Sequence, residues 1–403
     1  MHLALVIDDY LPKSTRVGAK MFHELACELN SMGYTITVIT PDDKQKSKLS
    51  YDILDGINIW RFRNGKIKGA NKISRALNET LLSFNAWSAI KNRINKNTFD
   101  AIIYYSPSIF FGSLIKKIKT RCNCKSYLVL RDLFPQWVID SGMIRKNSLI
   151  AHYFRYFEKM SYQQADTIGL MSKKNIEAYK NSDRTNEIYN VSVLRNWAKL
   201  HPSYSKSHYR NKLKLENKII YFYGGNIGHA QDMSNLMRLA KNMQSFEDAH
   251  FLFVGQGDEV ELINSLAKQW KLKNFTFLPS VSQDEFRELL SEVDIGLFSL
   301  AKNHSTHNFP GKLLGYMVQS LPILGSVNTG NDLLPIVNNA HAGFIHINGE
   351  DDKLLLSAIS LYKDVGLRYN IGKNSSALLL KEFDVKSAAK CILTSLGMYN
   401  ESC

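Results

Sequence analysis

The chain has 403 residues, of which 44% are hydrophobic and 22% are charged, so it can bury a large core without disulfides or metals, and disorder is excluded as its main state. At roughly 100 to 200 residues per domain, this length predicts two domains or three. The net charge of +14 lies in one half, because residues 1–200 carry 31 basic and 17 acidic side chains whereas residues 201–403 carry 20 of each. The first half is therefore expected to meet something anionic, which could be nucleic acid, a phosphorylated ligand or a membrane surface.

The first half alternates short β-branched runs with amphipathic segments, as parallel strands joined by helices do. Strands are expected at 3–7, 35–40, 57–62, 101–105, 126–130, 167–171 and 192–194, with Pro41 ending the second. Helices are expected over about 18–30 and 73–95. The first strand starts almost at the N-terminus and its apolar run is too short for a signal sequence.

A polar segment at 198–217 is expected to be a linker, after which the pattern restarts. The second half predicts strands at 219–223, 250–254, 275–278, 295–298 and 322–325, and helices at about 232–242, 260–271, 284–292 and 312–319. The fold class is therefore α/β, with two Rossmann-like domains facing a central cleft. The expected domains are 1–197 and 198–384, with a last helix at about 385–403 packing back on the first.

The five cysteines, Cys27, Cys122, Cys124, Cys391 and Cys403, are an odd number scattered over a long chain, which favours a reducing compartment. Cys122 and Cys124 have no second ligand pair nearby and are interpreted as ordinary thiols. No run approaches the roughly 18 to 20 apolar residues of a spanning helix, so the expected location is the cytosol or a membrane face.

The strongest local motif is the glycine turn after the strand at 219–223. Glycines at 224, 225 and 228 let backbone N–H groups approach a ligand closely, and the next helix N-terminus favours negative charge, so the segment suits a phosphate or diphosphate. The alternative is a turn that only packs strand on helix. Because position 223 is Tyr, the G-x-G-x-x-G fingerprint of a dinucleotide redox cofactor is incomplete.

Two further strand ends in the second half resemble ligand-binding turns. Gly255-Gln256-Gly257 repeats the glycine arrangement at the carboxyl end of the next strand, where open α/β sheets bind ligands. Leu278-Pro279 ends the third strand, where backbone groups could pair with a flat base or could form an ordinary β-to-α turn.

A polar loop, His304 to Gly311, leads into Lys312 at the start of a helix. A lysine in a first turn opposes the helix dipole, so an anionic diphosphate is its expected partner, and a solvated lysine is the alternative. His304 and His307 lack acidic partners at metal-ligand spacing, and no D-x-D pair ends a strand. No catalytic metal is expected.

Charged residues also end strands in the first half. Arg16 and Arg131 could grip a phosphate, and Asp9 or Asp132 could accept a proton. The alternative is that these charges only form salt bridges with one another.

A basic region surrounds the apolar stretch 81–90. Its members are Lys66, Lys68, Lys72, Arg75, Lys91, Arg93 and Lys96, and further on Phe110-Phe111 precede Lys116, Lys117 and Lys119. Basic residues beside exposed apolar ones suit the interface of an anionic bilayer. The alternative is a core helix with solvated lysines.

With these residues in view, the chain resembles glycosyltransferase family 4 of the two-domain GT-B type over nearly its whole length, and most of all the WbuB-type N-acetyl-L-fucosamine transferases of bacterial O-antigen and capsule clusters. The segments that carry the resemblance are Asp8–Gly18 with Ala19-Lys20, Leu130–Trp137, Leu194–Trp197, Gly225–Gly228 with Gln231-Asp232, and Asn308–Met317 with Pro322.

The resemblance implies a sugar-nucleotide donor on the second domain, an acceptor on the first and no metal or other cofactor. The donor-binding residues implied are Gly225, Asn226, Gly228, Gly255, Gly257, Leu278, Pro279, His307, Asn308, Phe309, Pro310, Gly311 and Gly315. The acceptor residues implied are Arg16, Gly18 and Arg131, and the catalytic ones are Asp132, Lys312 and Asp9.

The chain also departs from the family pattern. Many members carry two glutamates eight positions apart where this chain has His307 and Gly315, and an Arg and a Lys where it has Asn226 and Gln231. A histidine common after the fourth strand is replaced by Arg131. Diphosphate neutralisation is then expected to fall to Lys312 and helix dipoles. The family implies a retaining mechanism, but a β-linked L-sugar nucleotide that gives an α-linked product would react with inversion, which needs a base, so the stereochemistry stays open.

The resemblance predicts transfer of an N-acetylated 6-deoxy-sugar, L-FucNAc, from a UDP-sugar to an undecaprenyl-diphosphate-linked sugar in O-antigen or other surface polysaccharide biosynthesis. The expected protein is cytoplasmic and peripheral on the inner face of the cytoplasmic membrane. The alternative is a UDP-N-acetylhexosamine epimerase of the same fold. A nucleic-acid partner is not expected, because aromatic and basic stacking motifs are absent.

Overall fold

The computed structural model describes residues 1–399 except positions 15, 68, 70, 107, 141, 181–188, 205–207 and 304–309. The chain divides into two compact units, the first domain with Met1–Arg195 and Val385–Cys403, and the second domain with Asn196–Asp384. The boundary thus falls after Arg195, two residues before the expected one at 197.

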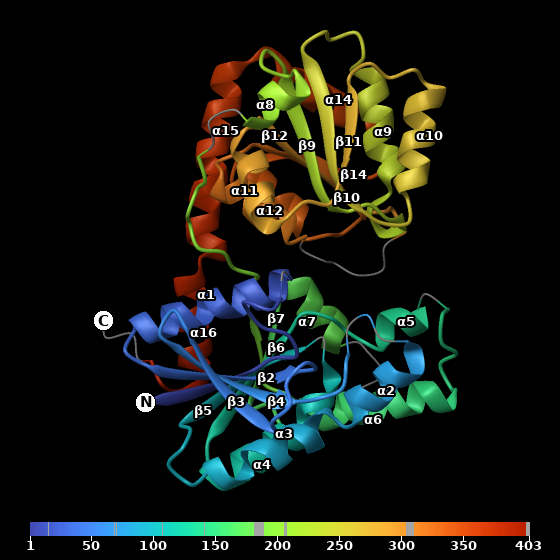
Figure 1. Cartoon of the computed structure of the whole chain (residues 1–403). Helices are drawn as coiled ribbons and strands as arrows, with labels where there is room; N and C mark the ends of the chain where they lie inside the picture. Colours follow the sequence, from blue (N-terminus) through green and yellow to red (C-terminus); the bar gives the residue numbers. More distant parts are fainter. Residues whose placement is uncertain are drawn as a thin grey trace. The chain divides into compact units, whose positions relative to one another are not determined.

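The first domain is built on one sheet with the strand order β3-β4-β2-β1-β5-β6-β7-β8 (Figure 1). Its strands are β1 (His2–Val6), β2 (Thr35–Asp42), β3 (Leu49–Leu54), β4 (Ile57–Arg63), β5 (Ala101–Ser106), β6 (Lys125–Leu130), β7 (Thr167–Leu170) and β8 (Val191–Val193). All neighbours are parallel except β3 and β4. The central strands are nearly continuous buried apolar runs, because helices cover a parallel sheet on both faces.

Helices complete the first domain. They are α1 (Val17–Ser31), α2 (Lys72–Thr80), α3 (Leu82–Ile90), η1 (Lys91–Arg93), η2 (Ile109–Phe111), α4 (Gly112–Cys122), α5 (Gln136–Asp140), α6 (Leu149–Tyr162), α7 (Lys173–Lys180) and α16 (Val385–Leu396). Helix α1 buries Ala19, Phe22, Ala26 and Leu29, whose spacing of three and four residues defines one face. Figure 1 shows α16, the last helix of the chain, beside α1, which it contacts together with β6.

Three expected features of the first domain differ in the structure. The helix expected over 73–95 is divided at Leu81 into α2 and α3. Strand β2 continues through Pro41 to Asp42, because a proline near the end of a strand removes only one donor from the ladder. The antiparallel hairpin of β3 and β4 was missed, although its turn, Asp55-Gly56 with φ of 50° and 78°, is a residue pair typical of two-residue hairpins.

The second domain is built on a six-stranded parallel sheet with the order β11-β10-β9-β12-β13-β14. Its strands are β9 (Ile219–Asn226), β10 (Ala249–Gln256), β11 (Phe275–Pro279), β12 (Ile295–Ser299), β13 (Ile323–Val327) and β14 (Gly343–Ile347). Successive residues of β9 serve opposite faces: Ile220 and Phe222 belong to one apolar cluster, and Tyr221 and Tyr223 to another. The sheet is therefore buried on both sides.

The second domain has helices over both faces of this sheet. They are α8 (His208–Leu213), η3 (His229–Gln231), α9 (Met233–Asn242), α10 (Val260–Gln269), α11 (Gln283–Ser291), α12 (Lys312–Val318), α13 (Leu333–Asn339), α14 (Asp351–Lys363), α15 (Val365–Leu378) and the π-helical turn η4 (Leu379–Phe383).

The segment 198–217, expected to be a linker, contains α8 and is anchored to the body of the second domain. Arg210 makes an ion pair with Asp294 at 2.7 Å, and its Nε donates to the carbonyl oxygen of Glu292 at 2.7 Å. The sequence did not predict this helix, because six residues are too few to show apolar periodicity.

A buried histidine in β10 gives the second domain an acid-sensitive position. Burial lowers the pKa of His250 to about 4, and its Nε2 lies 2.9 Å from Oγ1 of Thr276. Because the unfolded chain takes up a proton near pH 6.5 and the native one only near 4, stability is lost as the pH falls through this window. We expect wild type to lose about 3 kcal/mol of unfolding free energy relative to His250→Gln between pH 6.5 and 4. Urea denaturation at both pH values measures this difference, and equal losses would contradict it.

Among the residues that the structure describes, none of the helices has the length and apolar composition needed to cross a bilayer.

Candidate functional site

Two glycine segments are in backbone contact at the carboxyl ends of β9 and β10. Gly225 is the register partner of Gly255, and the N–H of Ile227 donates to the carbonyl oxygen of Gln256 at 2.9 Å. A Cβ on Gly255 would lie 1.9 Å from the carbonyl oxygen of Gly225, and one on Gly257 would lie 2.1 Å from that of Ile227. The structure therefore brings together the two turns singled out from the sequence, and only glycine fits at 255 and 257.

The three glycines of the first turn have different surroundings. A Cβ on Gly224 would lie 2.5 Å from the ring of Phe286, and one on Gly228 would lie 2.5 Å from Oδ1 of Asp258, so these two allow close packing. Gly225 is exposed, has a φ of 124°, and its missing Cβ would face Cε of Lys312 at 3.5 Å. Of the three glycines, Gly225 is thus the one that lies beside the side chain of Lys312.

The N-terminus of α9 is occupied by a side chain of the protein. Oε2 of the buried Glu259 accepts from the N–H of Met233 at 3.1 Å, and Oε1 lies 2.9 Å from Nδ1 of His229. This carboxylate complements the helix dipole at the amide of Met233, and the binding of a ligand phosphate at the neighbouring glycine turn stays a prediction. The neighbouring Asn226 is exposed and donates to Oε1 of Gln231 at 2.7 Å.

Lys312, at the start of α12, lies beside the first glycine turn. Part of its side chain is accessible, but its Nζ is buried, 3.5 Å from the centre of the Tyr223 ring. Among the described residues this ammonium has no hydrogen-bond partner. Burial lowers the pKa of Lys312 well below its ordinary value. A buried cation with three unused donors is costly unless a ligand supplies negative charge, so the alternative of a solvated lysine was wrong.

Helix α12 is fixed by Tyr316. Its hydroxyl donates to the carbonyl oxygen of Leu297 at 2.9 Å and accepts from the N–H of Gly224 at 3.3 Å, which ties α12 to β12 and β9. The neighbouring Gly315 faces α11, since its Cβ would lie 3.1 Å from Cδ1 of Leu290. A side chain at 315 would therefore require Leu290 to shift by a few tenths of an ångström.

The structure describes some of the remaining candidates for the donor site but not all of them. Pro279 is exposed at the end of β11 and is the register partner of Gly255, and Leu278 precedes it, half-buried. Pro310 and Gly311 form the entry to α12, and their carbonyl oxygens accept from the first amides of that helix. His307, Asn308 and Phe309 lie outside the described residues.

In the first domain, the loop after β1 is held by internal contacts. The hydroxyl of Ser14 donates to Oδ2 of Asp9 at 2.6 Å, and Nε of Arg16 lies 3.7 Å from the same oxygen. Asp9 and Arg16 thus form the mutual salt bridge that was the alternative for these residues. At the start of α1, Gly18 packs on Tyr105, whose hydroxyl would be 3.0 Å from a Cβ there.

Tyr105, at the end of β5, was missed from the sequence. Burial raises the pKa of Tyr105 to about 12; the charge of Arg131 lowers it and those of Asp8 and Asp132 raise it, so these three groups act on its hydroxyl electrostatically. The carboxyl ends of β1, β5 and β6 therefore meet at this residue, as strand ends of a parallel sheet should.

The guanidinium of Arg131 forms hydrogen bonds with the backbone of the same domain. Its Nη1 and Nη2 donate to the carbonyl oxygens of Leu194 and Arg195 at 2.7 Å and 2.9 Å. Burial lowers the pKa of Arg131 to about 10. This guanidinium therefore joins the end of β6 to the last residues of the first domain before Asn196, and its role towards an acceptor stays a prediction.

An exposed apolar stripe runs along α2 and α3. Ile73, Leu77, Leu81 and Phe84 are 76%, 59%, 46% and 64% exposed, and they follow one another at steps of four, four and three residues along α2, the junction at Leu81 and α3. We call these four residues the α2–α3 stripe. The opposite face of α3 buries its apolar side chains, which are Leu82, Ala86 and Ile90. Phe110 and Phe111 are buried too, so the expectation that they are exposed beside lysines was wrong.

The fold of this chain is similar to those of several solved enzymes. It superposes on sucrose-phosphate synthase from Thermosynechococcus elongatus with a TM-score of 0.70 at 15% identity, covering 98% of this chain and 97% of that one. HepE from Anabaena in complex with UDP and glucose gives 0.68 at 13%, with 99% and 100% covered. WaaG, a glycosyltransferase involved in lipopolysaccharide biosynthesis, gives 0.64 at 13%, with 97% and 98% covered. The fold is GT-B.

Sequence comparison adds the class of enzyme. The model of the family described as Glycosyl transferases group 1 matches residues 205–377. The putative colanic acid biosynthesis glycosyl transferase WcaI of Escherichia coli K12 is 23% identical over 329 residues, 76% of this chain and 78% of that protein. The probable glycosyltransferase WbjE of Pseudomonas aeruginosa is 22% identical over 227 residues, 55% of each chain. These matches support a glycosyltransferase of group 1.

Proposed function

We propose that this protein transfers an N-acetylated 6-deoxy-sugar, L-FucNAc, from a UDP-sugar to a sugar linked to undecaprenyl diphosphate during surface polysaccharide synthesis, at the inner face of the cytoplasmic membrane. The observation that carries the proposal is the buried ammonium of Lys312 beside Gly225, within the segment that matches the group 1 family.

The donor half of the proposal rests on complementary charge. A UDP-sugar carries a diphosphate, and three ammonium donors in a low-dielectric site stabilise the charge that develops on it as the bond from the anomeric carbon breaks. The exposed backbone at Gly225 leaves room for the phosphate oxygens to approach Lys312. UDP and UDP-glucose complexes of HepE, which shares the fold, support the choice of nucleotide. The sugar itself follows from the sequence resemblance.

The acceptor half is assigned to the first domain. An attacking hydroxyl must lose its proton, and in an inverting transfer a carboxylate takes it. Asp9 accepts from Ser14 and lies 3.7 Å from Nε of Arg16, and the charge of Asp132 acts on Tyr105; we assign the base to one of these two carboxylates, Asp132 or Asp9. The positive charge of the first half suits a diphosphate lipid.

A lipid-linked acceptor requires contact with a membrane, and the α2–α3 stripe is the proposed contact. Basic residues accompany it. Lys66 precedes α2 and Arg75 lies on it. On α4, Nζ of Lys117 and Cζ of Arg121 lie 5.8 Å and 4.8 Å from the ring centre of Trp87 on α3. Apolar side chains between basic ones match an anionic bilayer surface. The relatives named for colanic acid and lipopolysaccharide synthesis support a surface polysaccharide as the product.

Replacing Ile73, Leu77 and Phe84 together with serine is expected to lower binding to vesicles of phosphatidylglycerol and phosphatidylethanolamine at least about 100-fold, since each buried apolar side chain contributes roughly tenfold or more. Vesicle sedimentation measures the loss. The matched control is Leu356→Ser with Leu380→Ser, which changes two exposed leucines of the second domain. Equal binding by the triple variant and wild type would refute the proposed membrane contact.

The test of the activity itself is a transfer assay with a panel of UDP-sugars and an undecaprenyl-diphosphate-linked acceptor. Release of UDP that depends on both substrates supports the proposal. Conversion of a UDP-N-acetylhexosamine to an epimer without acceptor would establish the alternative, an epimerase, which the comparisons do not favour.

A further inference from the structure

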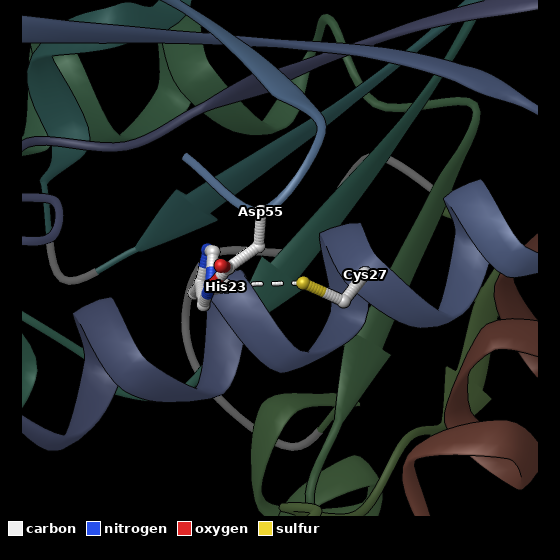
Figure 2. Close-up of side chains that lie close together, drawn as sticks. All are labelled: His23, Cys27 and Asp55. Carbon is white, nitrogen blue, oxygen red and sulfur yellow. Dashed lines mark hydrogen bonds and ion pairs between the residues drawn. The ribbon is translucent and has the colours of Figure 1, made fainter. Parts of the chain in front are cut away.

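Three side chains of the first domain, which the proposed transfer does not use, bring a nitrogen, a sulfur and an oxygen together. His23 and Cys27 lie one turn apart on α1, and Asp55 lies in the turn between β3 and β4 (Figure 2). Their ligand atoms all lie within 4.8 Å of one another. This combination of imidazole, thiol and carboxylate is the donor set that proteins use for zinc.

The two separations from Nε2 of His23 are close to those of tetrahedral coordination. With bonds of about 2.0 to 2.1 Å to nitrogen and 2.3 Å to sulfur, a tetrahedral ion holds the two ligand atoms about 3.5 Å apart. Sγ of Cys27 lies 3.6 Å from Nε2 of His23. Oδ2 of Asp55 lies 2.9 Å from the same nitrogen and would move outward by a few tenths of an ångström to admit an ion.

The second nitrogen of His23 is already oriented. Its Nδ1 lies 2.9 Å from the hydroxyl of Tyr10, a side chain that is 1% exposed. In the ion-free protein the Asp55 carboxylate can only accept, so Nε2–H donates to it and Nδ1 accepts from the hydroxyl of Tyr10. When an ion replaces the proton on Nε2, Nδ1–H donates to the same hydroxyl, which is the arrangement that metal-bound histidines have. The hydroxyl of Tyr10 can donate or accept, so it can partner Nδ1 in either state.

The local backbone fixes the third ligand. Asp55 has a φ of 50° in a two-residue turn, which holds its side chain against the middle of α1. The side chain of Asp55 is 68% exposed whereas that of His23 is 12% exposed, so an ion could enter from the side of the carboxylate and keep a water as its fourth ligand.

We propose that His23, Cys27 and Asp55 bind one zinc ion, with Tyr10 as the hydrogen-bond partner of the histidine. The ion would connect α1 to the β3–β4 hairpin. This site takes no part in the proposed transfer, so a test of zinc binding does not depend on the proposed function.

Cobalt is the probe that tests the site, because a thiolate bound to cobalt gives a charge-transfer band in the near ultraviolet. We expect the reduced, chelator-treated full chain to bind one equivalent of cobalt with this band, and zinc to abolish it by displacement. Cys27→Ser should lose the band, Cys27→His should bind cobalt without it, and Asp55→Asn and Tyr10→Phe should each weaken binding at least about 10-fold.

The matched control replaces two other cysteines of the same domain, Cys122→Ser with Cys124→Ser. It is expected to keep both the band and the stoichiometry of one cobalt per chain. The absence of a band in wild type, a band that survives in Cys27→Ser, or a band lost in the Cys122 and Cys124 variant would each overturn the proposal. Far-ultraviolet circular dichroism of every variant shows whether the fold is retained.

Discussion

Lys312→Met is expected to abolish sugar transfer while leaving the protein at least as stable as wild type. The change removes a cation that is buried without a hydrogen-bond partner among the described residues and replaces it with an apolar side chain of similar length. Removal of one donor that stabilises developing charge lowers kcat by about 10² to 10³. Because the ligand-free protein no longer buries an ammonium, its unfolding free energy should stay equal or rise.

The pH dependence of this stability difference has a defined sign. Burial lowers the pKa of Lys312, so between its lowered native value and the ordinary 10.5 the unfolded chain holds a proton that the native chain does not. The cost of burying this group is complete below that window and disappears as the pH rises through it. The excess stability of Lys312→Met over wild type should therefore shrink as the pH approaches 10.5.

Urea denaturation and the transfer assay, run on the same preparations, measure both effects. The control is Lys302→Met, which removes an exposed lysine of the same domain and should change neither quantity. Near-normal transfer by Lys312→Met, or a loss of stability of several kcal/mol, would contradict the assignment of Lys312 to the diphosphate.

Gly255→Ala is expected to have the largest effect on stability. Its Cβ would lie 1.9 Å from the carbonyl oxygen of Gly225, and neither backbone can move without breaking the pairing of β9 with β10. We expect the second domain to lose more than about 3 kcal/mol of unfolding free energy, because backbone overlap cannot be relieved by a rotamer change.

The matched control for this prediction is Gly366→Ala in α15. Gly366 is exposed, and its nearest atom to a new Cβ is Oδ1 of Asp364 at 3.3 Å, so the same chemical change should alter stability by less than about 1 kcal/mol. Thermal unfolding followed by circular dichroism compares the two variants. If Gly255→Ala melts within a few degrees of wild type, the two glycine turns are not packed as described.

The sequence predicted the two sheets because their strands are buried apolar runs, a pattern that depends on local composition alone. It did not predict the helix over His208–Leu213, because six residues carry less than two turns of periodicity. It did not predict the division at Leu81, because apolar residues at helical spacing continue across it. The β3–β4 hairpin could have been found from Asp55-Gly56 flanked by alternating residues.

Of the candidate site, the sequence identified Lys312 and the glycine turns through their position at strand and helix ends. It could not identify Glu259 as the group at the N-terminus of α9, or Tyr223 as the ring beneath the ammonium, because both contacts join residues far apart in the chain. The sequence also could not decide whether Asp9 and Arg16 pair with each other or with a ligand. Residue identities alone do not show which group neutralises a charge.

The most direct test of the donor site is calorimetric titration of wild type, Lys312→Met and Lys302→Met with UDP and with uridine. A charge-assisted hydrogen bond contributes about 1.5 to 3 kcal/mol, so wild type should bind UDP at least about 10-fold more tightly than uridine. We predict that this preference falls at least about 10-fold in Lys312→Met and is unchanged in Lys302→Met. An equal preference for UDP in wild type and Lys312→Met would contradict the account.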